Sequence, residues 1–236
     1  VQWIFKYRLL PQGHILHLQV DTFHIIMGFI FNKIKDEQDL KVEKPLILAT
    51  AGYDHSIKFW NVNSGLPTTS IAYADSHINK LAITADRRYL GVAAFNVVKV
   101  YEKARSQLRM HHLSLGILRR SQGNITALEF QKDNKWFFTA SEDGTLKTFD
   151  FKTSGYMRNF DNGGVMVNTA VLHPNQGEII FGDQSGRVRT WDLTENVPKE
   201  LYINDEEIPI RSLAISRNAK KLCAGDKEGS CYIWES

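Results

Sequence analysis

The sequence of 236 residues has only two cysteines, Cys223 and Cys231, and it lacks any long apolar run. Two cysteines cannot build a disulfide framework and suit a reducing compartment, so we predict a cytoplasmic protein. We expect Cys223 to face about residue 232 in a hairpin, which puts the two thiols on opposite faces and disfavours a disulfide. The longest apolar run, residues 25–31, has seven residues. A membrane span needs roughly 18, so no transmembrane segment is predicted.

The sequence also lacks a strong charge of one sign and the motifs of enzymes. Its formal net charge of +3 is too small to indicate a nucleic-acid-binding domain. It has no glycine-rich phosphate loop and no nucleophile elbow. None of its eight histidines stands at a spacing typical of a metal site. We therefore predict no catalytic residue, no cofactor, no metal, no bound nucleic acid and no small-molecule substrate.

One stretch carries a local excess of positive charge. Between positions 103 and 123 there are no acidic residues and five basic ones, which are Lys103, Arg105, Arg109, Arg119 and Arg120. Such a stretch can contact an acidic partner or phosphate groups, or it can be a solvated edge that discourages pairing with further strands. It contains no Trp, Tyr or Phe on which bases could stack, which argues against a nucleic-acid binder.

What the sequence does contain is a repeat. Five segments share small residues, then a polar turn, then an alternating strand that ends in an aromatic residue, which is Trp60, Tyr101, Phe149, Trp191 or Trp234. These aromatics are 41 to 48 residues apart. A four-stranded propeller blade takes roughly 40–45 residues, and its signature is a Trp-Asp pair such as Trp191-Asp192. The repeat therefore predicts an all-β protein, a WD-repeat β-propeller.

The repeat also defines the domain organisation that we expect. Residues 45–236 form a partial propeller. Its repeat begins with the second strand of the first blade and ends with the third strand of the fifth, so the first blade lacks its inner strand. Residues 1–44 lie outside the repeat. Within them, apolar residues alternate over residues 14–20, which we take as the best substitute for the missing inner strand. Residues 33–44 are charged and are typical of a linker.

Three aspartates, Asp54, Asp143 and Asp183, lie in the turns before third strands. A short carboxylate in such a turn accepts hydrogen bonds from backbone N–H groups and fixes the turn. We therefore predict a structural role for all three. A catalytic role is disfavoured, because turns select aspartate for structural reasons alone.

Polar residues recur at one register of the first strands. Each directly follows an apolar residue, and they are Asn79, Thr126, Asn168 and Arg211. Because the first strand of a blade is innermost, these side chains should ring one mouth of the central channel. Two interpretations stay open. The side chains either bond to loop backbone and channel water, or they form a docking surface for a partner.

Several longer segments carry a resemblance to a known family. They are ILATAGYDHSIKFW from Ile47, DSHIN from Asp75, LHPNQGEIIFGDQSGRVRTWDL from Leu172 and GSCYIWES from Gly229. Over about residues 46–236 the chain resembles the G-protein-β-subunit-like (lethal-with-SEC-thirteen number eight) subunits of the target-of-rapamycin (TOR) complexes. The run that contains HPNQ, GDQSG and WDL is the most specific part, because generic WD repeats do not share it.

The resemblance implies a seven-bladed propeller that is not an enzyme and that binds the catalytic domain of the TOR kinase. It implies docking through the loops that precede first strands, which on this chain means His77 and Asn79, and then Asn168 and Arg211. Five of the seven blades are visible in the sequence. We therefore predict an open arc of five blades whose last blade exposes an edge.

The sequence thus favours a non-enzymatic scaffold or regulatory subunit that docks on the TOR kinase catalytic domain, beside other subunits of TOR complexes. The alternative is a generic WD-repeat adaptor of another multiprotein complex. A propeller enzyme is disfavoured, because no His, Asp and Glu converge at the predicted mouth of the channel.

Overall fold

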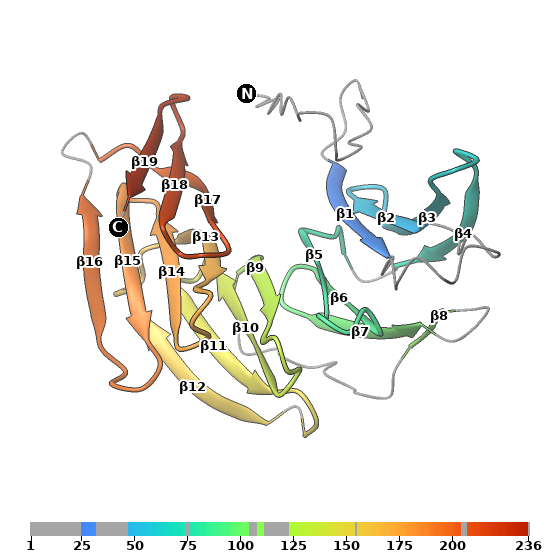
Figure 1. Cartoon of the computed structure of the whole chain (residues 1–236), viewed down its shortest axis with the longest axis horizontal. Helices are drawn as coiled ribbons and strands as arrows, with labels where there is room; N and C mark the ends of the chain where they lie inside the picture. The colour runs from blue at the N-terminus through green and yellow to red at the C-terminus, as the bar shows by residue number, and fades with distance from the viewer. Residues whose placement is uncertain are drawn as a thin grey trace.

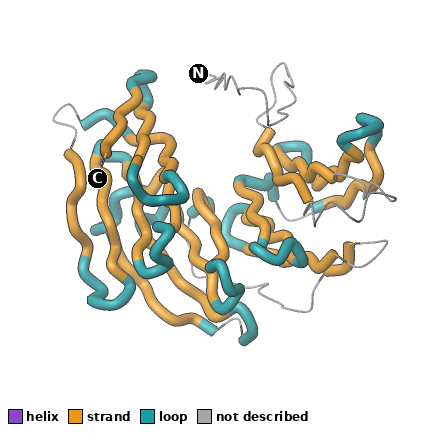
Figure 2. Tube along the Cα trace, in the orientation of Figure 1, coloured by secondary structure: helices purple, strands orange, loops and turns teal. Residues whose placement is uncertain are grey.

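The computed structural model describes residues 25–31, 47–73, 76–103, 108–110, 123–153, 155–203 and 207–235. Within these ranges every regular element is a β-strand (Figure 2). The strands form five antiparallel sheets that follow one another in sequence order (Figure 1). This arrangement confirms the predicted all-β class, and its sheets of three and four strands are consistent with propeller blades.

The first four sheets have four strands each, and the fifth has three. The first sheet contains β1 (Ile25–Phe31), β2 (Ile47–Gly52), β3 (Ser56–Asn61) and β4 (Pro67–Ala72). The second contains β5 (Lys80–Ile83), β6 (Tyr89–Ala93), β7 (Val98–Lys103) and β8 (Leu108–Met110). The third contains β9 (Ile125–Phe130), β10 (Trp136–Ser141), β11 (Thr145–Asp150) and β12 (Tyr156–Asp161). The fourth contains β13 (Val167–Leu172), β14 (Glu178–Asp183), β15 (Arg187–Asp192) and β16 (Pro198–Ile203), and the fifth β17 (Ile210–Ile215), β18 (Lys221–Asp226) and β19 (Cys231–Glu235).

The repeat of the sequence is a repeat of strand register. The signature aromatic near the end of each third strand pairs with an apolar residue in the second strand of the same sheet. Trp191 pairs with Ile179 in the fourth sheet, and Trp234 pairs with Leu222 in the fifth. Each sheet thus presents the same positions to its neighbours.

The core consists of apolar layers between consecutive sheets. In the fourth sheet, Ile179 and Trp191 are buried against the third sheet, whereas Ile180 and Val188 are buried against the fifth. Neighbouring residues of a strand point to opposite faces, so a middle blade needs apolar side chains at both sets of positions. This requirement explains why second strands such as β14 are almost continuously apolar.

The inner strand of the first sheet differs from the sequence prediction. We predicted that the first blade lacks this strand and that residues 14–20 are its best substitute. In the structure, β1 (Ile25–Phe31) pairs antiparallel with β2 and takes this position. Residues 14–20 lie outside the described residues. The segment that we placed outside the repeat therefore supplies a strand of the first sheet.

The position of the two cysteines also differs from the prediction. Cys223 pairs with Ile233, one residue beyond the expected position, and Cys231 pairs with Gly225. Because residues two apart share a face, the two thiols lie diagonally on the same face of the fifth sheet. Both are free. A shift of register by one residue was enough to reverse the predicted faces.

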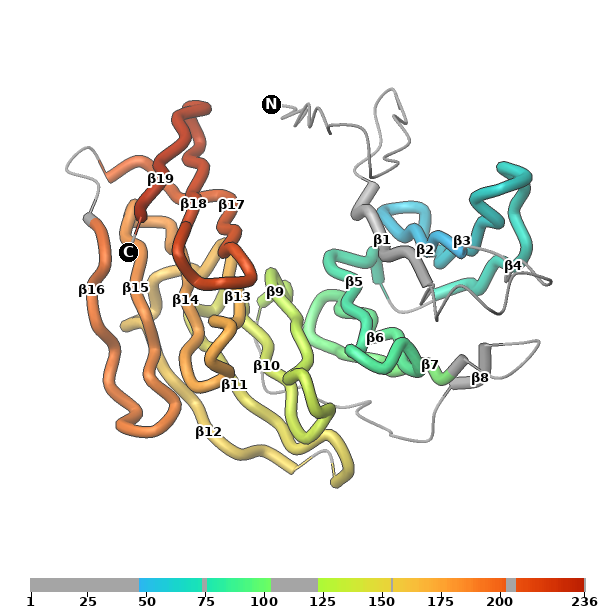
Figure 3. Tube along the Cα trace, in the orientation of Figure 1, coloured from blue at the N-terminus to red at the C-terminus, as the bar shows by residue number. Residues whose placement is uncertain are grey.

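The sheets contact one another in sequence order through their inner strands. β1 contacts β5, β5 contacts β9, β9 contacts β13, and β13 contacts β17. Among the described strands, no contact of comparable extent joins β17 to β1, so the five sheets form an open arc (Figure 3). The fifth sheet therefore has a bare face. Ile233 is 65% exposed there, whereas Thr190, its counterpart in the fourth sheet, is buried.

The tight contact between the fourth and fifth sheets generates a first prediction. A Cβ atom added to Gly182 would lie 2.5 Å from Cγ2 of Ile210 and 3.2 Å from Cγ2 of Thr169. We expect Gly182→Ala to lower the free energy of unfolding by about 1–3 kcal/mol, because a packed interface accommodates extra volume poorly. Urea denaturation checks it. Gly177→Ala is the control, because its Cβ would meet only Asn175 Oδ1, at 3.9 Å. Equal losses in both variants would contradict the prediction.

Candidate docking surface

Two of the polar residues at the common register of the inner strands bond to the next sheet. Thr126 Oγ1 donates to the carbonyl oxygen of Val167 at 2.8 Å. Asn168 Nδ2 donates to the carbonyl oxygen of Ile210 at 2.9 Å and to Gln184 Oε1 at 3.2 Å. In each case the acceptor carbonyl belongs to the first residue of the following inner strand. These side chains therefore join neighbouring blades along the channel.

Asn79 and Arg211 occupy the same register with different surroundings. Asn79 Nδ2 donates to Asn124 Oδ1 at 3.4 Å, so it contacts a side chain of the next sheet and not a backbone carbonyl. Arg211 is exposed, because it belongs to the last sheet of the arc. Thr126 and Asn168 thus bond to backbone, as in the first of the two interpretations left open by the sequence, but to strand residues of the next sheet and not to a loop.

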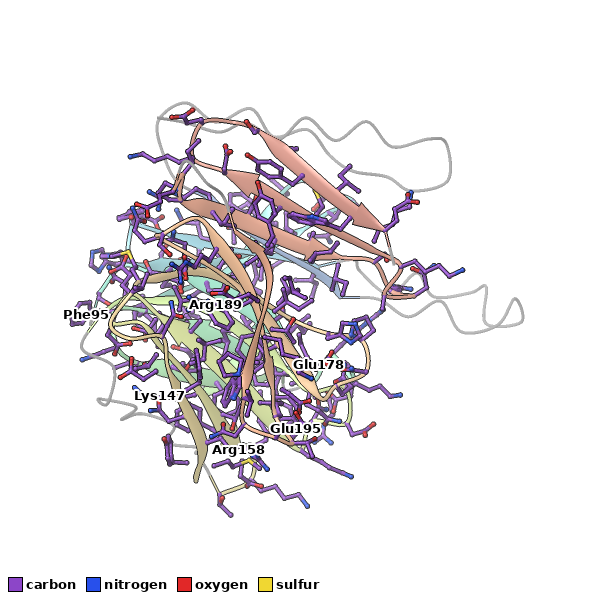
Figure 4. The ribbon with its side chains drawn as sticks, turned by 90° about the vertical axis from the view of Figure 1, so that its left-hand side faces the viewer. Phe95, Lys147, Arg158, Glu178, Arg189 and Glu195 are labelled. Atoms are coloured by element: carbon purple, nitrogen blue, oxygen red, sulfur yellow. The ribbon has the colours of Figure 1, made fainter. Side chains whose placement is uncertain are left out.

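His77 belongs to an aromatic patch that the sequence analysis missed. Its ring stacks on Tyr53, with ring centroids 4.7 Å apart and planes inclined by 16°. Tyr53 is 54% exposed, and Phe95, in the next sheet, is 44% exposed. We call Tyr53, His77 and Phe95 the aromatic patch. In Figure 4, Phe95 lies at one side of the molecule, away from Glu195.

Backbone contacts hold the loop of His77 between the two exposed aromatics. Ser76 Oγ accepts a hydrogen bond from the backbone N–H of Phe95 at 3.2 Å. The backbone N–H of Ile78 donates to the carbonyl oxygen of Gly52, the residue before Tyr53, at 3.2 Å. The loop is thereby fastened to the second-to-third-strand turns of both the first and the second sheet.

A sequence signal for the patch exists. Tyr53 directly follows the last residue of β2, and Phe95 lies two residues after the end of β6. The two positions are equivalent, because each lies the same distance beyond the residue that pairs with the signature aromatic of its sheet. The third, fourth and fifth sheets have Glu142, Gln184 and Lys227 at this position. The first and second sheets thus have an exposed aromatic residue at a position where the other three sheets have a polar one. Such a difference indicates a surface with a role of its own.

The turn aspartates accept the hydrogen bonds expected of them, but they do not all occupy one position. Asp54 Oδ1 accepts from the N–H of Ser56 at 3.2 Å, and a hydrogen bond from Lys58 lowers the pKa of the Asp54 carboxyl. Asp143 Oδ1 accepts from the N–H of Thr145 at 2.9 Å. Asp183 is the last residue of β14 and fully buried, and its Oδ1 accepts from the N–H groups of Ser185 and Arg187 at 2.9 and 3.1 Å.

The carboxylate that follows the signature aromatic also fixes a turn. Asp150 Oδ1 accepts from the N–H groups of Thr153 and Lys152 at 2.7 and 3.0 Å. Asp192 Oδ1 accepts from the N–H of Thr194 at 2.7 Å. These backbone donors favour the ionised form and hold the pKa of both carboxyls below the usual range. The Trp-Asp signature thus combines a core aromatic with the anchor of the following turn.

Neither a candidate metal centre nor a candidate membrane-spanning helix is found among the described residues. No group of three His, Cys, Asp or Glu side chains among them could hold a metal ion. In the same part of the chain, no helix has the length and apolar character to cross a membrane. Most of the basic stretch at 103–123 lies outside the described residues, so its predicted interactions stay predictions.

Comparisons with known proteins agree with this geometry. The family model described as "WD domain, G-beta repeat" matches residues 113–150. The chain is 39% identical to the target of rapamycin complex subunit wat1 of Schizosaccharomyces pombe over 80% of its length, which covers 59% of wat1. It is 36% identical to subunit LST8 of Saccharomyces cerevisiae and 33% identical to LST8 of Bos taurus, each over 80% of the chain and over 61% and 57% of those proteins. The chain thus spans about three-fifths of the length of these relatives.

The contacts between inner strands generate a second prediction. We expect Asn168→Ala to lower the free energy of unfolding by about 1–2 kcal/mol, because it leaves the carbonyl of Ile210 without this donor. Arg211→Ala, at the same register but exposed, should change it by no more than about 0.5 kcal/mol. Chemical denaturation of both variants measures the difference. Equal effects would show that the register position, and not the hydrogen bond to the next sheet, determines stability.

A third prediction concerns Glu129 on β9. Its Oε2 accepts from the N–H of Leu172 on β13 at 2.9 Å, and burial raises the pKa of this carboxyl. A raised pKa in the folded state stabilises the fold at low pH, and this contribution is lost as pH rises through the folded pKa. Glu129→Gln keeps an acceptor and removes the charge, so its stability relative to the native chain should increase from about pH 4 to pH 7.

Urea midpoints of both chains at several pH values measure this difference. Carboxyls elsewhere in the molecule titrate equally in both chains and cancel. A stability difference that does not change with pH would contradict the prediction.

Proposed function

Because the chain matches a WD-repeat family model over residues 113–150 and resembles LST8 proteins over four-fifths of its length, we propose that it is a non-enzymatic subunit of a TOR complex. The observation that carries the proposal is this similarity, since the relatives are named as target of rapamycin complex subunits. The chain spans only about three-fifths of these relatives, so its partners are part of the proposal.

The subunit docks on the catalytic domain of the TOR kinase and works in the cytoplasm. Rigid, hydrogen-bonded sheets support such a role, because binding then costs little loss of backbone freedom. The loops that join the strands lie at the ends of the sheets. Their conformation is held by buried side chains and by turns in which aspartates accept backbone hydrogen bonds. No cofactor, nucleic acid or small-molecule substrate takes part in this function.

The docking surface includes the loop before β5. His77 and Asn79 reach the surface there, and Arg211 is exposed at the equivalent register of the fifth sheet. Thr126 and Asn168 act mainly by holding the sheets that carry this surface, because their side chains already bond to the next sheet. In this proposal they position the docking surface, whereas His77 and Asn79 contact the partner.

A fourth prediction tests the proposal. The tagged full chain, co-expressed with the TOR kinase catalytic domain of its own organism, should retain that domain through affinity and size-exclusion chromatography in equimolar amount. The catalytic domain of an unrelated kinase is the control and should not be retained. Failure to retain the TOR domain, or equal retention of both kinases, would favour the alternative of an adaptor for another complex.

A further inference from the structure

We propose that Asn162 is a modification site, at which the side-chain amide is converted to a carboxylate, and that the packing of the fourth sheet on the third controls this conversion. The attacking group is the backbone nitrogen of Gly163. The inference is independent of the proposed function, because it concerns a contact between two sheets inside the protein.

The first argument is the dipeptide itself. Asn162-Gly163 is the only Asn-Gly pair in the sequence. The backbone nitrogen after an asparagine can attack the amide carbon Cγ and close a cyclic imide, and glycine favours this attack because it has no side chain to shield the nitrogen. Within the described part of the chain, the N–H of Gly163 donates no hydrogen bond, so no partner has to be lost before it reacts.

The loop between β12 and β13 also has room for the ring. Gly163 and Gly164 have φ angles of +66° and +75°, and a Cβ atom added to either residue would meet no other atom within 4 Å. Both glycines are exposed. Water, which the reaction consumes, can therefore reach this backbone.

The second argument is the restraint on the amide. Asn162 Nδ2 donates to Asp183 Oδ2 and to the carbonyl oxygen of Val165, both at 3.1 Å, and Asn162 Oδ1 accepts from Arg189 Nη1. Asp183 and Arg189 lie on β14 and β15, so the fourth sheet supplies two of these three partners. For the attack, Cγ must turn toward the nitrogen of Gly163, which opens these bonds. The conversion therefore proceeds in chains whose third and fourth sheets have separated at this point.

The reaction needs only water and hydroxide. Hydroxide takes the proton from the nitrogen of Gly163, and that nitrogen forms a bond to Cγ of Asn162. The bond from Cγ to Nδ2 breaks, and Nδ2 leaves as ammonia after it takes a proton from water, which regenerates the hydroxide. Water then opens the cyclic imide at one of its two C–N bonds and gives aspartate or isoaspartate.

The product does not fit the closed interface. An acceptor replaces the donor Nδ2 of Asn162, so the new carboxylate would lie beside Asp183, which is fully buried. The guanidinium of Arg189, 3.9 Å from Asp183 Oδ2, already lies 3.2 Å from Glu200 Oε1. Neighbouring carboxylates repel one another, and a buried charge without a partner is strongly destabilising. The modification therefore hinders the two sheets from closing again, and a brief opening becomes a lasting one.

The fifth prediction concerns the full chain in mildly alkaline buffer. Asn162 should be converted there at least about tenfold more slowly than in the same chain unfolded in urea, because its hydrogen bonds must first open. Arg189→Met removes a charged donor from Oδ1 and keeps a long side chain, so it should raise the rate in the folded chain at least about threefold. Peptide mapping by mass spectrometry measures the conversion of amide to acid, and labelling by an isoaspartyl methyltransferase identifies the isoaspartate.

Arg158→Met is the matched control, because Arg158 is an exposed arginine of β12, and Arg189 and not Arg158 bonds to Asn162 (Figure 4). It should leave the rate unchanged. Circular dichroism shows whether each variant folds. If Arg189→Met does not fold, Glu200→Gln takes its place, because it weakens a contact that holds Arg189, and it should also raise the rate. Asn162→Asp, which mimics the product, should make the amide hydrogens of β12 and β15 exchange faster than in the native chain.

Three outcomes would overturn the inference. The first is an Asn162 that stays unmodified in the folded chain after prolonged incubation, while the unfolded chain is fully converted. The second is a rate that is equal in folded and unfolded chains, or that a folded Arg189 variant leaves unchanged, since the fourth sheet would then not control the conversion. The third is an Asn162→Asp chain whose hydrogen exchange matches that of the native chain. None of these results bears on the proposed function, which retention of the kinase domain tests separately.

Discussion

The need of each middle sheet for a packed neighbour on both of its faces is the constraint on which this structure depends. A blade places apolar residues at successive positions of its middle strands, so a single sheet in water would expose two apolar faces. In the fourth sheet, Ile179 and Trp191 need the third sheet, and Ile180 and Val188 need the fifth. The hydrogen bonds from Thr126 and Asn168 add a polar seam to this packing, because they join the inner strands at their ends.

The architecture could be read from the sequence because it is repeated. Five aromatic strand ends at nearly constant spacing gave the blades, their order and the register of the inner strands. The strand β1 could not be read in the same way, because its sequence is a plain apolar run with no signature aromatic and lies 15 residues before β2. The register of β18 against β19 could not be fixed either, since nothing in the sequence of this hairpin distinguishes two registers that differ by one residue.

The candidate site was predictable only in part. The resemblance pointed to His77 and Asn79, and the common register pointed to Thr126 and Asn168. The sequence could not show what each side chain contacts. A polar residue at the mouth of a channel can form a hydrogen bond within the fold or contact a partner protein. Tyr53 was hidden for a different reason. Its stacking on His77 joins residues of two sheets, which only the folded chain brings together.

The sequential contacts of the sheets have a consequence for how stability is distributed. Each blade touches only the blades before and after it, as in a solenoid, so local stability is approximately a sum of blade and nearest-neighbour terms. The third and fourth sheets have a packed neighbour on both sides, whereas the fifth has one. The first sheet likewise packs against one neighbour, so amide hydrogens should exchange with solvent most slowly in the middle of the arc and faster in the first and fifth sheets.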